Sequence, residues 1–288
     1  MKNLLIATDF SVNANHAAGY GYFLASQLKE DIILCNTFFV PAEAPQSAMI
    51  AWPLVEYDEL NEASAKELNE LRDTLLKNDH DFRFKPAIKC ANEPGLLADT
   101  LNTFIEEGNI EMTILGTHGN TGLNTLIMGN HSRKMIDAAK GLLMLVPLTA
   151  KITPIKKIAF ATDFRDPEQD LEIIYKLIQT IRPLNAELLV THITHESWPE
   201  TNLRKSLEHF LTEISNKADY PKIYYRIVRS DKPEKGLEWL CDHGQVDVLA
   251  MVHRDHGVLM EIINGSHTKR IADIISIPLL VIPENFAE

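Results

Sequence analysis

Two stretches of the chain carry the same apolar strand leading into the same four residues. The first is Leu4-Leu5-Ile6-Ala7-Thr8-Asp9-Phe10, and the second is Ile158-Ala159-Phe160-Ala161-Thr162-Asp163-Phe164. Each copy opens a half-chain that closes with a short apolar strand and a proline, Leu142 to Pro147 in the first half and Leu279 to Pro283 in the second. This repetition predicts a tandem duplication, in which two similar units are joined end to end.

Length and composition indicate a globular protein with two domains. The 288 residues, of which 45% are hydrophobic and 24% charged, are enough for two ordinary cores. The formal net charge of −12 argues against nucleic-acid and membrane partners, because both are bound through basic surfaces. No apolar run approaches the roughly 20 residues that a membrane span needs. Three widely spaced cysteines without a CxxC pair (Cys35, Cys90 and Cys241) indicate reduced, mostly buried thiols. We therefore expect a soluble cytoplasmic protein.

Each half alternates short β-rich runs with amphipathic helical stretches, which is typical of parallel α/β units. In the first half we predict strands near 3–8, 31–37, 83–90, 111–116 and 142–146, and helices near 13–29, 58–79, 95–107 and 130–139. In the second half we predict strands near 157–162, 187–193, 222–229, 246–251 and 279–282. Asn13 is a suitable N-cap for the first helix, and Pro94 suits the start of the third.

The first half is longer than the second. The two Asp-Phe pairs lie further apart along the chain than Gly129 and Gly265 do. We place the extra residues in Phe38 to Tyr57, which has three prolines and no helical period, as a loop after the second strand. A loop in that position overlooks the ligand crevice of a doubly wound sheet. The linker is Leu148 to Pro154, so the predicted domains are 1–148 and 155–288. We expect them to pack as an intramolecular pseudo-dimer in which the closing strands 142–146 and 279–282 meet at the interface, because these apolar strands would otherwise expose sheet edges.

A set of glycines follows the fourth predicted strand. Gly116-Thr117-His118-Gly119 is followed, after nine residues, by Gly129-Asn130, where a helix is predicted to begin. Glycine at a strand exit lets a phosphate approach the backbone, and a helix start presents free N–H groups to an anion. The alternative is that these glycines only form a turn and let a helix pack closely.

This pattern resembles the nucleotide-binding signature of the universal stress protein family, Gly-x2-Gly-x9-Gly followed by a small polar residue. The Thr8 to Ser11 opening and the apolar closing strands are similar to the two ends of that family, and the resemblance covers both halves. It implies an α/β fold class of two tandem Rossmann-like domains, each a five-stranded parallel sheet with helices on both faces. It also implies a regulatory protein of the stress response that binds ATP, AMP or ADP in the first domain, with Mg²⁺ accompanying the phosphates.

The resemblance assigns residues position by position. Ala7, Thr8 and Asp9 match the adenine side of the family's site, and Thr37 matches the position that packs on the base. The phosphate and ribose side is implied for Gly116, His118, Gly119, Gly129, Asn130, His131 and Ser132. Asn130 departs from the family, which usually has Ser or Thr there. Asparagine keeps a capping side chain but supplies no hydroxyl to a phosphate or its metal.

The second half departs further from the signature. Alignment of Gly265-Ser266 with Gly129-Asn130 places Val252 and Asp255 where the two loop glycines belong. Val252 brings a branched side chain to the place of close approach, and Asp255 brings bulk and a negative charge. We therefore predict a degenerate nucleotide site in the second half.

Other candidates have simpler explanations. His253, Asp255 and His256 could hold a metal, but they lack compact zinc spacing, and exposed or hydrogen-bonded histidines are the more common case. His118 could act as an acid or base. Asp9 and Asp163 could be catalytic carboxylates, although such strand-end aspartates are at least as often structural. No catalytic residue is predicted.

Three function classes remain open. A nucleotide-binding regulatory module comes first, a slow ATPase or phosphotransferase second, and a partner-binding module without nucleotide third. An unidentified protein partner is expected in the first case, and a homodimer is possible in each. Turnover separates the first two classes, and a nucleotide titration separates the third.

Overall fold

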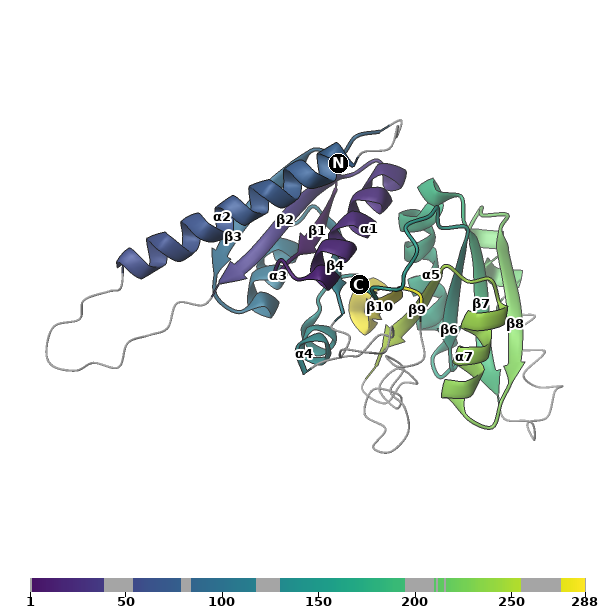
Figure 1. Cartoon of the computed structure of the whole chain (residues 1–288). Helices are drawn as coiled ribbons and strands as arrows, with labels where there is room; N and C mark the ends of the chain where they lie inside the picture. Colours follow the sequence, from purple (N-terminus) through teal and green to yellow (C-terminus); the bar gives the residue numbers. More distant parts are fainter. Residues whose placement is uncertain are drawn as a thin grey trace, which may run out of the picture.

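The computed structural model describes residues 2–38, 54–78, 84–117, 130–194, 210, 212–214, 216–254 and 276–287. Within them, the strands form one 10-stranded sheet in the order β3-β2-β1-β4-β5-β10-β9-β6-β7-β8 (Figure 1). The strands of each half are parallel to one another. The fold is therefore α/β, with two tandem Rossmann-like halves that share a single continuous sheet.

The strands of both halves are arranged in the same order in the sheet, β3-β2-β1-β4-β5 in the first half and β8-β7-β6-β9-β10 in the second. The first half contains β1 (Asn3–Ala7), α1 (Val12–Leu28), β2 (Asp31–Phe38), α2 (Leu54–Lys77), β3 (Ile88–Pro94), α3 (Leu97–Glu106), β4 (Ile110–Gly116), α4 (Asn130–Ala138) and β5 (Leu143–Val146). The second contains β6 (Lys157–Thr162), α5 (Pro167–Ile181), η1 (Arg182–Leu184), β7 (Glu187–Thr194), β8 (Ile223–Arg229), α7 (Pro233–His243), β9 (Val248–His253), β10 (Leu279–Pro283) and η2 (Glu284–Ala287).

The closing strands of the two halves meet at the centre of the sheet, as predicted. β5 and β10 pair antiparallel, with Leu145 opposite Leu279 and Leu143 opposite Val281. Each of these strands is buried along its whole length. Pairing satisfies two sheet edges that would otherwise expose apolar strands. We keep the boundaries 1–148 and 155–288 as a proposal.

Two apolar layers cover the sheet, one on each face. One layer joins residues of α1, α2 and α5, such as Leu24, Leu68 and Ile174, and it extends across both halves. The opposite layer joins residues of α3, α4 and α7, such as Ile136 and Leu237. The central strands face both layers, which explains why their sequences are continuously apolar.

Several local predictions were wrong. The third strand lies at Ile88–Pro94 and not at 83–90, and Pro94 ends this edge strand instead of beginning a helix. An edge strand tolerates proline because one side of its backbone is unpaired. Ser11, and not Asn13, caps α1, with its Oγ accepting from Ala14 N at 3.2 Å. The expectation of mostly buried cysteines is confirmed, since Cys35 and Cys241 are buried and Cys90 is exposed.

The predicted loop at Phe38 to Tyr57 lies largely outside the described residues, and α2 already begins at Leu54. Over the part of the chain that the structure describes, no helix is long and apolar enough to span a bilayer.

Candidate functional site

Both copies of Ala-Thr-Asp-Phe form the same turn at the carboxyl end of the middle strand of their half. The phenylalanine adopts a left-handed backbone, with φ 61° at Phe10 and 54° at Phe164, which bulky residues rarely do. In each copy the threonine hydroxyl and the aspartate carboxylate accept backbone N–H groups two residues ahead. These bonds are Phe10 N to Thr8 Oγ1 (2.9 Å), Ser11 N to Asp9 Oδ1 (3.0 Å), Phe164 N to Thr162 Oγ1 (2.9 Å) and Arg165 N to Asp163 Oδ1 (3.2 Å). Both aspartates therefore have a structural task.

A cavity of about 110 Å³, which we call the first crevice, lies beside the first turn. It opens at the carboxyl ends of β1, β2 and β4, between the starts of α1 and α3 and the body of α4. Its lining is mostly small or apolar: Ala7, Thr8, Asp9, Ser11, Ala14, Asn36, Thr37, Leu97, Leu115, Gly116 and Met135.

The first crevice brings together five of the residues that the sequence singles out: Ala7, Thr8, Asp9, Thr37 and Gly116. His118, Gly119 and Gly129 lie outside the described residues. Asn130, His131 and Ser132 form the start of α4, and only their backbone is described. Sequence reasoning missed the other six lining residues, and Ser11, Asn36 and Met135 illustrate why. The first two neighbour predicted residues, so a wider window would have included them, whereas nothing in the sequence signals Met135.

A buried amide network holds the floor of the first crevice. Asn36 Nδ2 donates to the Thr8 carbonyl oxygen at 2.7 Å. The Ser64 hydroxyl lies 2.8 Å from Asn36 Oδ1 and 2.7 Å from Asn92 Oδ1. Because these side chains lie on different elements, the network fixes the end of β1 relative to β2, β3 and α2.

Gly116 has a packing reason to lack a side chain. A Cβ at this position would lie 2.6 Å from the Asn13 carbonyl oxygen, at the start of α1. Asn13 Nδ2 also donates to the Thr117 carbonyl oxygen at 2.7 Å. The close helix packing that was the alternative explanation for the glycines is therefore present at Gly116, although it does not prevent a ligand from approaching the open side.

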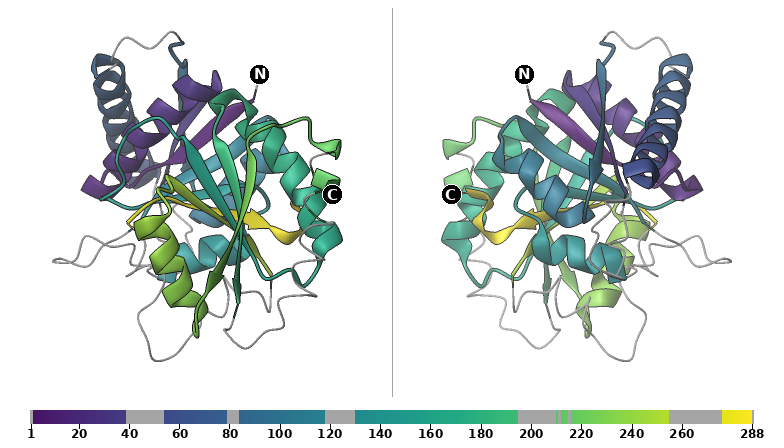
Figure 2. Two further views of the ribbon diagram at one scale, coloured as in Figure 1. Left: turned by 90° about the vertical axis from the view of Figure 1, so that its right-hand side faces the viewer. Right: turned by 90° about the vertical axis from the view of Figure 1, so that its left-hand side faces the viewer.

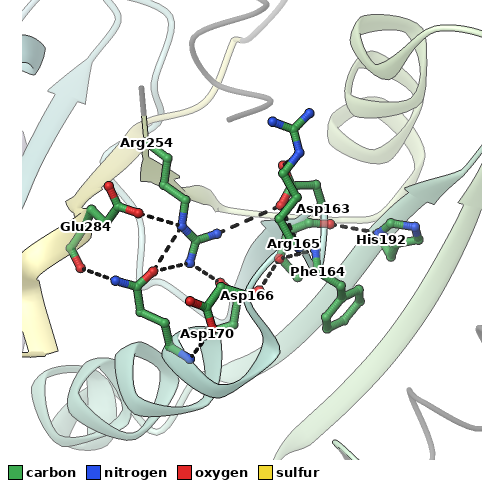
Figure 3. Close-up of polar contacts among 10 residues, drawn as sticks. Asp163, Phe164, Arg165, Asp166, Asp170, His192, Arg254 and Glu284 are labelled. Carbon is green, nitrogen blue, oxygen red and sulfur yellow. Dashed lines mark hydrogen bonds and ion pairs between the residues drawn. The ribbon is translucent and has the colours of Figure 1, made fainter. Parts of the chain in front are cut away.

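In the second half, the equivalent place contains an ion cluster centred on Arg254 (Figure 3). The pairing of β9 with β6 is equivalent to the pairing of β4 with β1, with Ala250 opposite Phe160 and Ile114 opposite Ile6. Continued by two residues, this register aligns Val252 with Gly116. By sequence position, Arg254 therefore aligns with His118. The Arg254 side chain is 11% exposed, and Nη2 lies 2.7 Å from Asp170 Oδ1. Further contacts are Nη2 to Gln169 Oε1 (2.9 Å), Nη1 to Asp163 Oδ1 (3.9 Å) and Nε to Glu284 Oε1 (3.5 Å). Arg254 was not among the predicted residues, because it belongs to no motif that can be recognised in the sequence.

Burial governs the titration of the second site. Burial raises the pKa of the Asp170 carboxyl above its ordinary value of 3.8, although hydrogen bonds from Thr162 and Arg254 oppose this shift. Burial also lowers the pKa of His192, whose Nδ1 lies 3.0 Å from the Thr162 carbonyl oxygen. Because a carbonyl oxygen only accepts, Nδ1 carries the proton of the neutral ring. His192 thus repeats the contact that Asn36 makes with Thr8.

The candidate metal residues do not form a cluster where they are described. His253, at the end of β9, contacts Asp137 on α4 of the other half, with 3.3 Å between Nε2 and Oδ1. Asp255 and His256 lie outside the described residues. Within the described ranges, no group of three His, Cys, Asp or Glu side chains is arranged to hold a metal ion.

Comparison with known proteins agrees with the α/β fold. A model described as the universal stress protein family matches residues 1–147, which is more than half of the chain. The chain belongs to the universal stress protein family. A search of the curated proteins finds no significant match.

Solved structures share the universal stress protein fold over the whole chain. A universal stress protein from Archaeoglobus fulgidus DSM 4304 has a TM-score of 0.72 at 14% identity and covers 98% of both chains. A putative universal stress protein from Pseudomonas aeruginosa UCBPP-PA14 has a TM-score of 0.58 at 12% identity, covering 100% of this chain and 95% of its own. The cytoplasmic domain of a prokaryotic cation chloride cotransporter has a TM-score of 0.54 at 11% identity, covering 99% and 98%. At identities this low, the structural similarity establishes a shared fold and nothing more.

Proposed function

We propose that the first crevice binds an adenine nucleotide, and that the protein is a cytoplasmic regulator of the stress response that reports nucleotide occupancy to a partner. The observation that carries this proposal is the position of the crevice. It lies at the carboxyl ends of β1, β2 and β4, where the strand order reverses around β1. In open α/β sheets, ligands bind at such a reversal point.

The lining of the first crevice suits a base more than a charged group. Ala7, Leu97, Leu115 and Met135 offer apolar contacts, and Thr8, Asp9 and Thr37 offer polar atoms for the edges of a base or a ribose. The described cavity, at about 110 Å³, is smaller than the roughly 300–1,000 Å³ of sites that enclose whole ligands. The base would therefore occupy this cavity, while the phosphates extend toward the backbone N–H groups of Asn130, His131 and Ser132 at the start of α4. Residues His118, Gly119 and Gly129 are assigned to the same phosphate side by their family positions.

The same lining argues for binding without fast chemistry. Among its described lining residues the first crevice has no lysine or arginine. Phosphoryl transfer needs such a charge, or a metal, to neutralise the charge that develops in the transition state. We expect Mg²⁺ to arrive with the phosphates of the nucleotide, because the described residues supply no ready cluster of metal ligands.

The second half is proposed to lack nucleotide. Its equivalent place contains the Arg254 guanidinium, which Asp170 and Gln169 hold by hydrogen bonds. A nucleotide would have to displace a nearly buried ion pair and would meet the branched side chain of Val252. We therefore infer one nucleotide site per chain.

Titration calorimetry with ATP, ADP and AMP on the full chain tests this function. We expect saturable binding with one site per chain, and release of an adenine nucleotide on denaturation of the purified protein, detected by mass spectrometry. Two equivalent sites, or no binding of any adenine nucleotide, would contradict the proposal. Turnover on the order of 1 s⁻¹ or faster would favour the phosphotransfer alternative over a regulatory role.

A further inference from the structure

Another cavity, of about 300 Å³, lies where the linker meets both halves, and we call it the junction cavity. Its described lining comes from α1, from the linker, and from the residues that directly precede β9 and β10. The linker runs beside α1 on the side of the second half (Figures 1 and 2), and His16 Nε2 of α1 lies 2.9 Å from the Ala150 carbonyl oxygen. The described linings of the junction cavity and the first crevice have no residue in common.

A buried tyrosine contributes its hydroxyl to the junction cavity. Tyr20 lines the cavity from α1 and is only 3% exposed. Within the described ranges, no protein group forms a hydrogen bond with this hydroxyl. Burial, and secondly the nearby Asp247 carboxylate, raise the pKa of the Tyr20 phenol above its ordinary value of 10.0, so the hydroxyl keeps its proton and can donate. Because an unsatisfied buried hydroxyl is costly, we expect this one to face a bound molecule or water.

Two opposite charges line the junction cavity, Lys151 from the linker and Asp247 from the start of β9. The Asp247 carboxylate is held in place, because its Oδ2 accepts from Lys156 N at 2.7 Å and from Lys157 N at 2.8 Å. Within the described part of the chain, its Oδ1 and the Lys151 ammonium form no hydrogen bond or ion pair, with each other or with another residue. A ligand that carries both charges can therefore lie between them.

The remaining described lining sets the size and polarity of an occupant. Val246, Ile277 and Pro278 form an apolar wall. Thr149 Oγ1 donates to the Ser276 carbonyl oxygen at 3.1 Å, which ties the linker to the second half at the cavity. A volume of about 300 Å³ is at the lower end of the range for small-molecule sites. The cavity thus suits a small ligand with a short aliphatic part.

Loose packing between the halves, with water in the space, is the simpler explanation for the junction cavity. Water would satisfy the Tyr20 hydroxyl, but it gains nothing from the apolar wall. Elsewhere between the halves, polar side chains contact each other directly, as Thr180 contacts Glu111 and His253 contacts Asp137. A cavity whose described lining combines two opposite charges, a buried hydroxyl and an apolar wall suits an amphipathic ligand better than water alone.

We propose that the junction cavity binds a small zwitterion, an α-amino acid with a short aliphatic side chain. Its ammonium would face Asp247 Oδ1, and its carboxylate would face Lys151 and accept from the Tyr20 hydroxyl. The aliphatic side chain would pack on the apolar wall. Such a ligand contacts α1, the linker and the second half together, so its binding would stabilise the folded chain.

The test uses the full chain with L-alanine, L-valine and L-proline, each titrated by ligand-observed NMR and by calorimetry. At least one should bind saturably, with a dissociation constant of about 1 mM or lower that saturating ATP leaves unchanged. The N-acetyl derivative of the tightest-binding amino acid lacks the ammonium, and its amide derivative lacks the carboxylate. Each derivative loses a charge-assisted hydrogen bond and should bind at least about tenfold more weakly.

Two single variants test the junction cavity itself. Tyr20→Phe removes only the hydroxyl and Lys151→Glu reverses the charge, so each should weaken amino-acid binding at least about tenfold. The matched controls, Tyr225→Phe and Lys66→Glu, make the same changes at exposed positions outside the cavity and should leave binding unchanged. Without ligand, Tyr20→Phe should melt no lower than the wild type, because the described chain gives its hydroxyl no partner to lose.

Several results would overturn the proposal. The absence of saturable binding for all three amino acids would leave the cavity to water. Equal binding of either derivative, unchanged affinity in Tyr20→Phe or Lys151→Glu, or an equal loss in a control variant would place the ligand elsewhere. Displacement by ATP would assign the amino acid to the first crevice, and a lower melting temperature of ligand-free Tyr20→Phe would give the hydroxyl a structural role. Because nucleotide binding is measured separately, failure here leaves the proposed nucleotide site unaffected, and the reverse also holds.

Discussion

The two crevices begin with the same turn but have different contents. In both halves a Thr-Asp-Phe turn ends the middle strand, and a side chain from the next strand, Asn36 or His192, contacts the threonine carbonyl oxygen. Beyond that shared scaffold, the first crevice is lined by small and apolar groups, whereas the second is crossed by Arg254 and its carboxylate partners. The repeated motif therefore identifies the fold, and the residues facing the crevice decide whether a ligand fits.

The largest expected difference between the halves is the effect of removing Arg254. Arg254→Ala leaves the fully buried Asp170 carboxylate without its cation, a change that typically costs roughly 3–5 kcal/mol. We expect a loss of this size in the free energy of unfolding at pH 7, measured by urea denaturation. Arg165→Ala is the matched control, because Arg165 pairs with Asp163 at 3.2 Å but is 51% exposed. Its loss should stay below about 1 kcal/mol.

The loss in Arg254→Ala should depend on pH. The pKa of folded Asp170 is already raised, and removal of the guanidinium raises it further. A carboxyl whose pKa is higher in the folded than in the unfolded state favours folding most at low pH, and this stability is lost as the pH rises through the folded pKa. The difference between wild type and variant should therefore shrink as the pH falls toward 4. A loss equal to that of Arg165→Ala, or one independent of pH, would mean that the Arg254 cluster is not the element that distinguishes the second half.

The second prediction concerns the first crevice. Thr37→Glu places a carboxylate in its lining, where it would repel an anionic ligand and lose hydration when the ligand binds. We expect ATP affinity to fall roughly a hundredfold, or about 2.7 kcal/mol. Thr103→Glu makes the same substitution at an exposed position of α3 and should leave the calorimetric affinity unchanged. Equal ATP affinity in both variants would mean that the nucleotide does not bind in this crevice.

The sequence was informative about the scaffold because the scaffold is local and repeated. The Thr-Asp-Phe turn, the apolar strands and the pairing of β5 with β10 all follow from short patterns with a fixed physical meaning. The Arg254 cluster could not be predicted, since it joins α5, the end of β9 and Glu284 across long stretches of chain. The prediction that Asn13 caps α1 was wrong for a related reason. It suits an N-cap, but its amide instead reaches the Thr117 carbonyl oxygen, more than a hundred residues away.

A smaller effect on ATP affinity should distinguish the N-cap residue of α1 from that of α5. Ser11 caps α1 and Asp166 caps α5, each through a side-chain oxygen that accepts a backbone N–H. Ser11→Ala and Asp166→Ala should each lower the free energy of unfolding by about 1 kcal/mol. Only Ser11 also lines the first crevice, so only Ser11→Ala should weaken ATP binding. Equal calorimetric affinity in the two variants would place the ligand away from the start of α1.

The finest difference between the crevices is a dependence on pH. His192 and Asn36 make the same contact with a threonine carbonyl oxygen, but only His192 titrates. Because burial lowers its pKa below 6.5, the neutral ring stabilises the fold fully above that pH, and this stability is lost as the pH falls through the lowered pKa. His192→Asn keeps a donor of the kind that the first half uses and removes the titration. Urea denaturation between pH 7 and pH 5 should therefore show a shallower loss of stability in the variant than in the wild type. Parallel curves would mean that the two contacts respond alike to acid and that the acid sensitivity of the protein arises elsewhere.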